Sequence, residues 1–347
     1  MKVQEKYIKR CIELAKNGLG TTYPNPLVGC VIVYENKIIG EGWHKKSGEA
    51  HAEVIAIESV QNKKLLSSST LYVSLEPCSH FGKTPPCADL ILKYKIPNVV
   101  IGTIDPNSKV AGKGIQKLKD SGVNVTFGIL EKECNELNKR FFTFHRKSRP
   151  FIILKWAESS DGFISPKNRS EEKPVWISNE YSRQLVHKWR SEEQAILVGT
   201  QTIIDDNPSL TVRDWTGENP IRVIIDKENN VDSSKNVFDN QAKTIVFSSK
   251  EVNSNSETIQ NIKIDFDINS TQTIVEKLYE NNIQSIIIEG GSKTIQSFID
   301  ANIWDEARVF NGEIKLHDGT KAPEFKKAIY SKSYLKKDTL LTYRNDD

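Results

Sequence analysis

The sequence has 347 residues, of which 37% are hydrophobic and 27% are charged, and 48 basic against 45 acidic residues give a net charge of +3. A chain of this length is expected to form two domains, because single hydrophobic cores rarely grow so large. The even balance of charge argues against the strongly basic surface of nucleic-acid-binding proteins, and no apolar run is long enough to predict a membrane span.

The N-terminal half of the chain alternates between helix and strand patterns. The first two expected strands are separated by Tyr34, Glu35 and Asn36, which indicates a hairpin. Strands that alternate with helices predict a mostly parallel sheet with helices on both faces. The expected helices cover residues 4–17, 50–60, 86–94, 114–121 and 131–144, and the expected strands cover residues 27–33, 37–43, 70–75, 98–103 and 123–128.

The first residues lead directly into a helix pattern, without the apolar segment of a secretory signal, so we expect a cytoplasmic protein. An odd count of five cysteines in such a protein does not suggest a disulfide framework. Three of them, Cys11, Cys30 and Cys134, fall at apolar-face positions, and we interpret these three as core residues.

A polar, basic stretch at residues 145–150 is the best candidate for a linker. We therefore predict one domain over residues 1–146 and a second α/β domain over residues 147–347. The polar segments 228–240 and 248–261 are expected to be rich in loops. Strands of the second domain are expected at residues 151–156, 194–198, 221–225, 244–247 and 285–288.

One histidine and two cysteines fall at the ends of predicted elements. His51 stands where a helix begins, Cys78 follows the strand 70–75, and Cys87 begins the next helix. Zinc prefers a tetrahedron of nitrogen and sulfur ligands, and a catalytic site keeps the fourth position for water. A helix N-terminus also stabilises a thiolate. These three residues therefore predict a catalytic Zn²⁺ site.

Glu53 lies two residues after His51 and is not needed as a ligand. A carboxyl beside zinc-bound water can take a proton from it and deliver the proton to leaving ammonia. Zinc deaminases share an H-x-E…P-C-x-x-C pattern in which this glutamate is the general acid and base, although the second interval is longer here. An H-x-E triplet alone can be a surface pair, but the four residues together favour a deaminase with Glu53 as its catalytic residue.

The segment between the two cysteines narrows the class of deaminase. Residues 76–87, which read Glu-Pro-Cys-Ser-His-Phe-Gly-Lys-Thr-Pro-Pro-Cys, resemble the deaminase of riboflavin biosynthesis. Residues 25–29, 42–44, 105–107 and 110–114 resemble it too, which implies a cytidine-deaminase-like αβα sandwich. Without this resemblance, Lys83 would be interpreted as an ordinary surface residue. The resemblance implies substrate contacts from Asn25, His44, His80, Lys83 and Asn107.

In the second domain, a buried strand runs through two glycines into a helix pattern. Residues 286–294 read Ile-Ile-Ile-Glu-Gly-Gly-Ser-Lys-Thr, and no G-x-G-x-x-G fingerprint follows a strand. Glycines let a backbone approach a ligand closely, and a helix N-terminus binds phosphate. Because Gly-Gly also serves as an ordinary turn, this motif alone does not decide whether a cofactor binds here.

Residues 154–162, 175–178 and 195–213 resemble the reductase partner of the same pathway. The chain is thus similar to the bifunctional riboflavin-biosynthesis deaminase–reductases from about residue 5 to residue 310. That reductase family shares its fold with dihydrofolate reductases and uses NADPH, which implies a dihydrofolate-reductase-like α/β domain here. The resemblance places on the cofactor side Ala157, Ile164, Ser165, Trp176, Thr202, Asp206, Gly291, Ser292 and Thr294. It places on the substrate side Pro174, Arg190, Leu210, Arg213 and Glu289.

Arginines suit the substrate side, because a guanidinium can bind a ribose phosphate through two hydrogen bonds. Lys155, on the first strand of the second domain, is a candidate to polarise the sugar carbonyl during hydride transfer. Taken singly, each arginine would more often form a surface salt bridge, and Trp176 would usually be a core residue. The chain departs from the family's pattern after Trp304–Ala307, which leaves the C-terminal edge and its subunit contacts open.

Together these features predict a bifunctional enzyme. The first domain is expected to deaminate 2,5-diamino-6-ribosylamino-4(3H)-pyrimidinone 5′-phosphate with Zn²⁺, and the second to reduce the ribosyl group to ribityl with NADPH. The expected partner is this small phosphorylated pyrimidine, with no nucleic acid and no membrane, and we expect a homo-oligomer. Two alternatives stay open: a zinc nucleoside or tRNA deaminase with a non-catalytic second domain, and a non-enzymatic regulator that only binds a pyrimidine or nucleotide.

Overall fold

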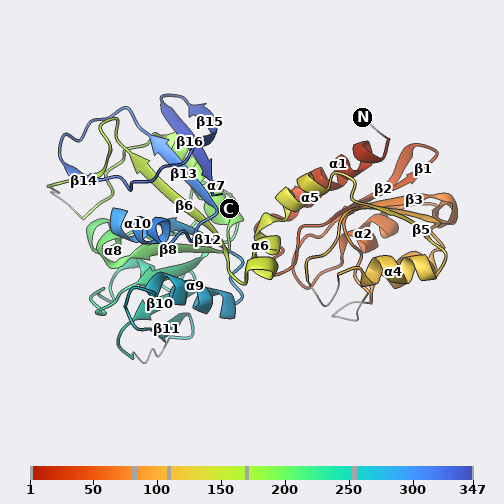
Figure 1. The fold of residues 1–347 in the computed structure, drawn as a ribbon, viewed down its shortest axis with the longest axis horizontal. Coiled ribbons are helices and arrows are strands. Elements are labelled where there is room, and N and C mark those ends of the chain that lie inside the picture. The colour runs from red at the N-terminus through yellow and green to blue at the C-terminus, as the bar shows by residue number, and fades with distance from the viewer. Residues whose placement is uncertain (1–2, 80–84, 108–110, 169–171, 252–255, 346–347) are drawn as a thin grey trace. The chain divides into compact units, whose positions relative to one another are not determined.

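The computed structural model describes residues 3–79, 85–107, 111–168, 172–251 and 256–345. The chain forms two compact units, Met1–Ser148 and Arg149–Asp347, and each is built around its own β-sheet (Figure 1). Within the described part of the chain, none of the helices is both long and apolar enough to cross a membrane.

Among the described residues, the N-terminal unit holds a five-stranded sheet in the order β2-β1-β3-β4-β5. Strands β3, β4 and β5 run parallel, whereas β1 is antiparallel to both β2 and β3. Four of these five strands therefore point the same way, which agrees with the predicted mostly parallel sheet, and β1 runs in the opposite direction as part of the β1–β2 hairpin. The strands are β1 (Gly29–Tyr34), β2 (Lys37–Trp43), β3 (Thr70–Leu75), β4 (Asn98–Thr103) and β5 (Asn124–Phe127).

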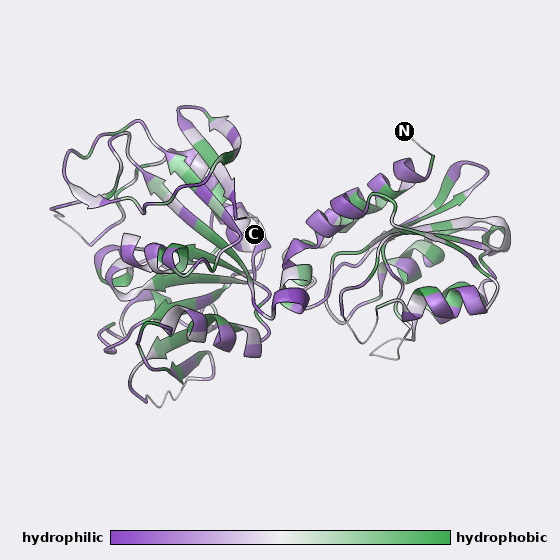
Figure 2. Cartoon of the chain, viewed as in Figure 1, coloured by the Kyte–Doolittle hydropathy of each residue, from purple (hydrophilic) through white to green (hydrophobic). Residues whose placement is uncertain are grey.

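Helices cover both faces of this sheet, which confirms the predicted αβα sandwich. Apolar side chains of α2, α3 and α4, among them Ile57, Ile91 and Leu118, share one core with the sheet, and those of α1 and α5 share another. Hydrophobic colouring accordingly runs along the strands, while the helices alternate between polar and apolar residues (Figure 2). The helices are α1 (Val3–Ala15), α2 (Ala52–Ser59), α3 (Cys87–Lys93), α4 (Lys113–Asp120), α5 (Glu131–Leu137) and α6 (Lys139–Lys147), with short 3₁₀ turns at Lys16–Gly18 and Lys63–Ser68.

The three cysteines that we interpreted as core residues are buried. Cys11, Cys30 and Cys134 are free thiols with no exposed surface. Cys11 donates a hydrogen bond from its thiol to the backbone oxygen of Tyr72, with a distance of 3.3 Å. Their interpretation as packing residues is confirmed.

The single helix predicted over residues 131–144 is divided at Asn138 into α5 and α6. Asn138 is buried, and its side chain accepts a hydrogen bond from the backbone N–H of Leu27 at 2.8 Å and donates one to the oxygen of the same residue at 2.9 Å. An asparagine that bonds backbone groups elsewhere competes with regular helix geometry. Asn138 thus links α5 and α6 to the segment before β1.

We expect Asn138→Ala to lower the free energy of unfolding of the N-terminal unit by about 2–4 kcal/mol, because it leaves both buried backbone groups of Leu27 without a partner. Urea denaturation followed by amide hydrogen exchange within Met1–Ser148 measures the change. Asn124→Ala is the matched control, since Asn124 is exposed and its side chain donates a hydrogen bond to the side chain of Asn98 on the surface; its effect should stay within about 0.5 kcal/mol. Equal effects of the two substitutions would contradict the structural role of Asn138.

In the described part of the C-terminal unit, a nine-stranded sheet has the order β11-β10-β9-β8-β12-β6-β13-β16-β15. Neighbours from β11 to β13 pair in parallel, and β13, β16 and β15 pair antiparallel. The strands are β6 (Phe151–Glu158), β8 (Ala195–Gly199), β9 (Ile221–Ile225), β10 (Thr244–Ser248), β11 (Ile259–Lys263), β12 (Ser285–Glu289), β13 (Glu306–Asn311), β15 (Ile329–Leu335) and β16 (Asp338–Arg344), with a separate β7 (Phe163–Pro166) and β14 (Gly319–Lys321) pair.

Helices cover both faces of this second sheet as well. Residues of α9 and α10, among them Leu278 and Phe298, pack on one face, and residues of α7 and α8, among them Trp189 and Ile203, pack on the other. The parallel strands β6, β8 and β12 end side by side, so their carboxyl ends form one edge at which ligands commonly bind in α/β sheets. The helices are α7 (Glu180–Glu192), α8 (Thr200–Asp206), α9 (Ser270–Glu280) and α10 (Ser292–Asp300), with a 3₁₀ turn at Asn236–Phe238.

Each strand predicted for the second domain is present, but the structure adds others. Strand β11 lies partly within residues 248–261, which were predicted to be rich in loops. Where the sequence departs from the family's pattern, Phe310 and Asn311 still complete strand β13, and the glycine-led strand β14 pairs with β7. The departure therefore leaves the sheet intact.

Candidate active sites

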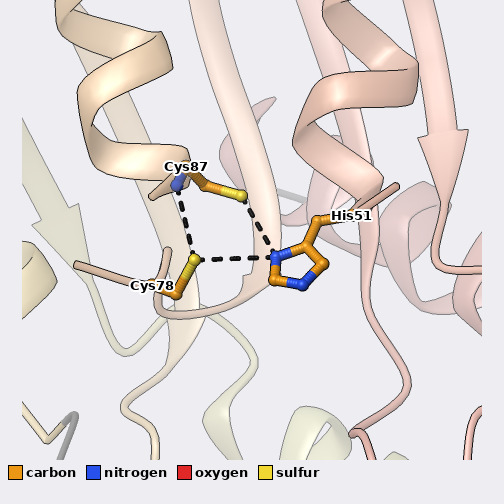
Figure 3. A group of neighbouring side chains, drawn as sticks. All are labelled: His51, Cys78 and Cys87. Atoms are coloured by element: carbon orange, nitrogen blue, oxygen red, sulfur yellow. Dashed lines mark hydrogen bonds between the residues drawn. The ribbon is translucent and has the colours of Figure 1, made fainter. Parts of the chain in front are cut away.

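Three side chains from separate elements meet in the N-terminal unit (Figure 3). His51 directly precedes α2, Cys78 follows β3, and Cys87 is the first residue of α3. The Nδ1 atom of His51 lies 3.6 Å from Sγ of Cys78 and 3.3 Å from Sγ of Cys87. The possible ligand atoms all lie within 4.8 Å of one another.

This group has the chemistry and spacing of a zinc site. Zn–N and Zn–S bonds in a tetrahedron place neighbouring ligand atoms about 3.5 Å apart, close to the separations found here. The hydrogen bond from Cys87, opposed by burial and aided by a bond from His51, lowers the pKa of Cys78 to about 4. A thiolate is the form of cysteine that binds metal. One nitrogen and two sulfurs leave a fourth position for water.

Glu53 lies in the first turn of α2, and only 3% of it is exposed. Burial, and then the negative charge on Cys78, raises the pKa of this carboxyl to about 7. A group of that pKa can both hold and release a proton near neutral pH. Glu53 therefore has the properties of a general acid and base beside the His–Cys–Cys group.

Two predicted substrate residues lie next to this group. Asn25 Nδ2 lies 3.0 Å from Nε2 of His44, and Nδ1 of His44 lies 3.1 Å from the backbone oxygen of Ala50. His44 therefore donates from Nδ1 and accepts at Nε2, and burial lowers its pKa. Its ring centroid lies 5.5 Å from that of His51. The predicted contacts His80 and Lys83 lie outside the described residues.

A buried carboxylate that the sequence interpretation missed organises the loop after β4. Glu76 accepts hydrogen bonds from the backbone N–H groups of Asp105, Gly112, Gly114 and Ile115, with distances of 2.9–3.3 Å. This loop carries Asn107, whose N–H donates to the side chain of Asp105 at 2.8 Å. Glu76 stands in the Glu-Pro-Cys triplet that the sequence analysis quoted. Its role could not be predicted, because its partners are backbone N–H groups, which no particular side chain marks in the sequence.

In the C-terminal unit, charged side chains gather where β12 ends beside β6. Glu289 accepts from Arg190 at 2.7 Å, and its carboxylate lies 3.9 Å from Nζ of Lys155. Although burial opposes ionisation, the charges of Arg190 and Lys155 lower the pKa of Glu289 to about 2. Burial, with a smaller effect from Arg190, lowers the pKa of Lys155. The structure therefore joins three predicted reductase residues in one polar cluster.

A second group lies where α7 approaches the segment after α8. The backbone oxygen of Thr211 accepts from Arg190 at 3.4 Å, and its hydroxyl oxygen accepts from the guanidinium of Arg213 at 3.3 Å. Leu210, just before it, is buried in a left-handed conformation with φ of 55°. A leucine in this conformation is strained, and such strain often marks binding sites.

Several residues predicted on the cofactor side meet at the N-terminus of α10. The backbone N–H of Gly291 donates to the hydroxyl of Thr202 at 2.9 Å. A Cβ atom at Gly199 would lie 2.7 Å from the hydroxyl of Thr294, so the backbone of the β8–α8 junction packs closely on α10. Ser292 begins α10. This junction presents glycine backbone at a helix N-terminus, where phosphate groups bind.

The remaining predicted residues are more dispersed. Ala157 lies on β6, Ile164 and Ser165 lie on β7, and Asp206 ends α8. Pro174 and Trp176 lie on an exposed segment before α7, and Trp176 is 57% exposed with its ring 4.5 Å from the guanidinium of Arg183. The expectation that a tryptophan here would usually be a core residue is wrong for this position.

Comparisons with known proteins match a different family to each of the two units. Residues 1–103 match the family described as the cytidine and deoxycytidylate deaminase zinc-binding region, and residues 150–314 match the RibD C-terminal domain. The riboflavin biosynthesis protein RibD of Aquifex aeolicus is 41% identical over 313 residues, covering 89% of this chain and 86% of that protein. The RibD of Escherichia coli is 34% identical over 323 residues, covering 88% and 86%.

Solved structures show the same relationship over both units. A diaminohydroxyphosphoribosylaminopyrimidine deaminase/5-amino-6-(5-phosphoribosylamino)uracil reductase from Thermotoga maritima aligns with a TM-score of 0.90 and 38% identity, covering 99% of this chain and 98% of that one. RibD of Acinetobacter baumannii aligns with a TM-score of 0.88 and 31% identity, covering 99% of each chain. The matches favour neither a nucleoside or tRNA deaminase with an inert second domain nor a non-enzymatic regulator. The chain belongs to the RibD family of riboflavin biosynthesis proteins, and it is a bifunctional enzyme that joins a zinc-binding deaminase domain to a reductase domain.

Proposed function

We propose that the N-terminal domain deaminates 2,5-diamino-6-ribosylamino-4(3H)-pyrimidinone 5′-phosphate and that the C-terminal domain reduces the ribosyl group of the product to ribityl. The observation that carries this proposal is the meeting of His51, Cys78 and Cys87 beside the buried Glu53. The substrates are those that the name of the Thermotoga maritima protein prints for its two activities.

In the deaminase domain, His51, Cys78 and Cys87 would hold Zn²⁺. A bound zinc ion supplies a water molecule with a lowered pKa as the nucleophile. Glu53 accepts a proton from that water and passes it to the amino group, so that ammonia leaves. Asn25, His44, His80, Lys83 and Asn107 contact the substrate, and the hydrogen bond between Asn25 and His44 fixes both side chains beside the zinc ligands.

In the reductase domain, Lys155, Arg190 and Glu289 face the sugar. A bound NADPH would supply the hydride to C1′ of the ribosyl group as the C1′–O4′ ring bond breaks, and Lys155 donates a hydrogen bond to O4′, the sugar oxygen on which negative charge develops. Glu289 keeps Lys155 and Arg190 in place through its ion pairs. Pro174, Leu210 and Arg213 complete the substrate side, with the guanidinium of Arg213 suited to the 5′-phosphate.

NADPH would bind along the edge formed by β6, β7, α8 and the N-terminus of α10. Backbone N–H groups at a helix N-terminus suit the pyrophosphate of a dinucleotide, and the glycines of this junction leave room for it. The residues that we assign to the cofactor are Ala157, Ile164, Ser165, Trp176, Thr202, Asp206, Gly291, Ser292 and Thr294.

We further propose a homo-oligomer that works in the cytoplasm. Strand β15 lies at the edge of the large sheet and exposes Ile329, Tyr330 and Tyr334 by 52%, 57% and 69%. Exposed edge strands with apolar side chains are surfaces on which chains pair. The five cysteines are free thiols, as is usual in the reducing cytoplasm, which supports this location.

Mass spectrometry of the freshly prepared diaminopyrimidine, incubated anaerobically with the zinc-loaded protein, tests the proposal. Without a nicotinamide cofactor, we expect one amino group to be replaced by oxygen. With NADPH, we expect the further gain of two hydrogens, and a parallel incubation with NADH measures the preference between the two cofactors. Deamination without reduction would contradict the reductase assignment, and no reaction at all would contradict both.

A further inference from the structure

Beside the half-buried Arg190, the guanidinium of Arg213 makes no ion pair with a carboxylate of the described residues. Arg190 is ion-paired with Glu289 at 2.7 Å, whereas the hydrogen bond of the Arg213 guanidinium goes to the hydroxyl of Thr211. Among the residues that the structure describes, no carboxylate lies within ion-pair distance of Arg213. Partial burial of the guanidinium and the positive charge of Arg190 lower the pKa of Arg213, and the negative charge of Asp214 only partly opposes this shift. Arg213 is therefore ready to receive an anion.

The backbone of Arg213 is fixed by a histidine on α7. His187 is 5% exposed, and its Nδ1 atom accepts a hydrogen bond from the backbone N–H of Arg213 at 3.1 Å. His187 lies one helical turn before Arg190 on α7, so a single helix supplies one guanidinium directly and anchors the other.

The environment of His187 keeps its ring in the form that this hydrogen bond needs. Burial, followed by the positive charges of Arg190 and Arg213, lowers the pKa of His187 to about 4. The neutral ring must carry its proton on Nε2, because Nδ1 accepts, and Nε2 lies 3.5 Å from the carboxylate of Asp214. Asp214 thus favours the tautomer in which Nδ1 is free to accept.

We propose that His187 is a positioning residue of the reductase domain, which holds the Arg213 segment so that its guanidinium meets the 5′-phosphate of the substrate. This inference rests on the proposed function, in which Arg213 lies on the substrate side. In this proposal His187 acts through the backbone of Arg213 and not on the sugar or the cofactor, so its loss should affect the binding of phosphorylated substrate and leave the hydride step intact.

The test compares two substitutions of similar size. His187→Leu removes the acceptor, whereas His187→Asn keeps an oxygen close to the place of Nδ1. With 5-amino-6-(5-phosphoribosylamino)uracil as substrate, His187→Leu should raise KM about tenfold, as expected for loss of one charge-assisted contact, with kcat little changed. His187→Asn should recover most of the wild-type KM. With the dephosphorylated compound, neither substitution should change KM.

Arg213→Ala separates this inference from the function on which it rests. If Arg213→Ala raises KM only for the phosphorylated compound and His187→Leu does not, His187 has no positioning role and the inference is wrong. If His187→Leu raises KM equally for both compounds, its role is general to the fold, which also overturns the inference. If Arg213→Ala changes neither KM, the assignment of Arg213 in the proposed function fails, and the inference fails with it.

Discussion

Replacing Glu53 by glutamine is expected to slow deamination by roughly a thousandfold while the reductase domain keeps its activity on the already deaminated pyrimidine. Glutamine has nearly the same size as glutamate, so the packing of the first turn of α2 should be preserved. The amide cannot take a proton from the zinc-bound water or deliver one to the leaving ammonia. The measurement is the rate of ammonia release, together with NADPH oxidation when the deaminated compound is supplied.

Glu58→Gln is the matched control for this experiment. Glu58 lies on the same helix but is exposed. Lys63 donates a hydrogen bond to the backbone oxygen of Glu58, which the substitution leaves in place. Both activities should remain at wild-type levels in that variant. Zinc content should be unchanged in Glu53→Gln, because Glu53 is not a ligand. Loss of both activities in a folded, zinc-loaded Glu53→Gln protein would contradict the assignment of separate sites.

Patterns that depend on neighbours in the sequence predicted much of the fold. The alternation of helices and strands gave β2, β3, β4 and β9 with the bounds that the structure has. The division at Asn138 was not predictable, because the partner of its amide is Leu27, far away along the chain. Strand β11 was missed because an edge strand with polar residues between Ile259 and Ile262 has no clear alternation.

The two sites differ in how much of each could be predicted. His51, Cys78 and Cys87 follow from ligand chemistry and from the expected ends of elements, and the structure brings them together. Glu76 and His187 were missed because both act on backbone N–H groups, which any residue provides. A sequence contains no complementary side chain to mark such a partner. Residues that position others therefore require the structure, whereas residues that bind metal can be recognised by type and spacing.

Replacing Lys155 by methionine is expected to lower kcat for the reduction by about a hundredfold and to leave deamination unchanged. Methionine fills a similar volume but cannot donate a hydrogen bond to the sugar oxygen. The fold should persist, because Glu289 keeps its ion pair with Arg190. Lys337→Met is the control, since the side chain of Lys337 is 79% exposed and forms a surface ion pair with Glu313. NADPH oxidation under saturating cofactor measures the effect.

The dependence of this reduction on pH distinguishes proton donation by Lys155 from simple packing. Only the protonated lysine makes a charge-assisted hydrogen bond that stabilises a developing negative charge, so the rate falls as pH rises through its pKa. Because burial lowers the pKa of Lys155, we expect the fall to begin at a lower pH than it would for an exposed lysine. The residual activity of Lys155→Met should lack this alkaline limb. A wild-type rate in Lys155→Met, or an unchanged alkaline limb, would show that another group stabilises the sugar oxygen, and Arg190, which shares Glu289 with Lys155, would then be the next cation to examine.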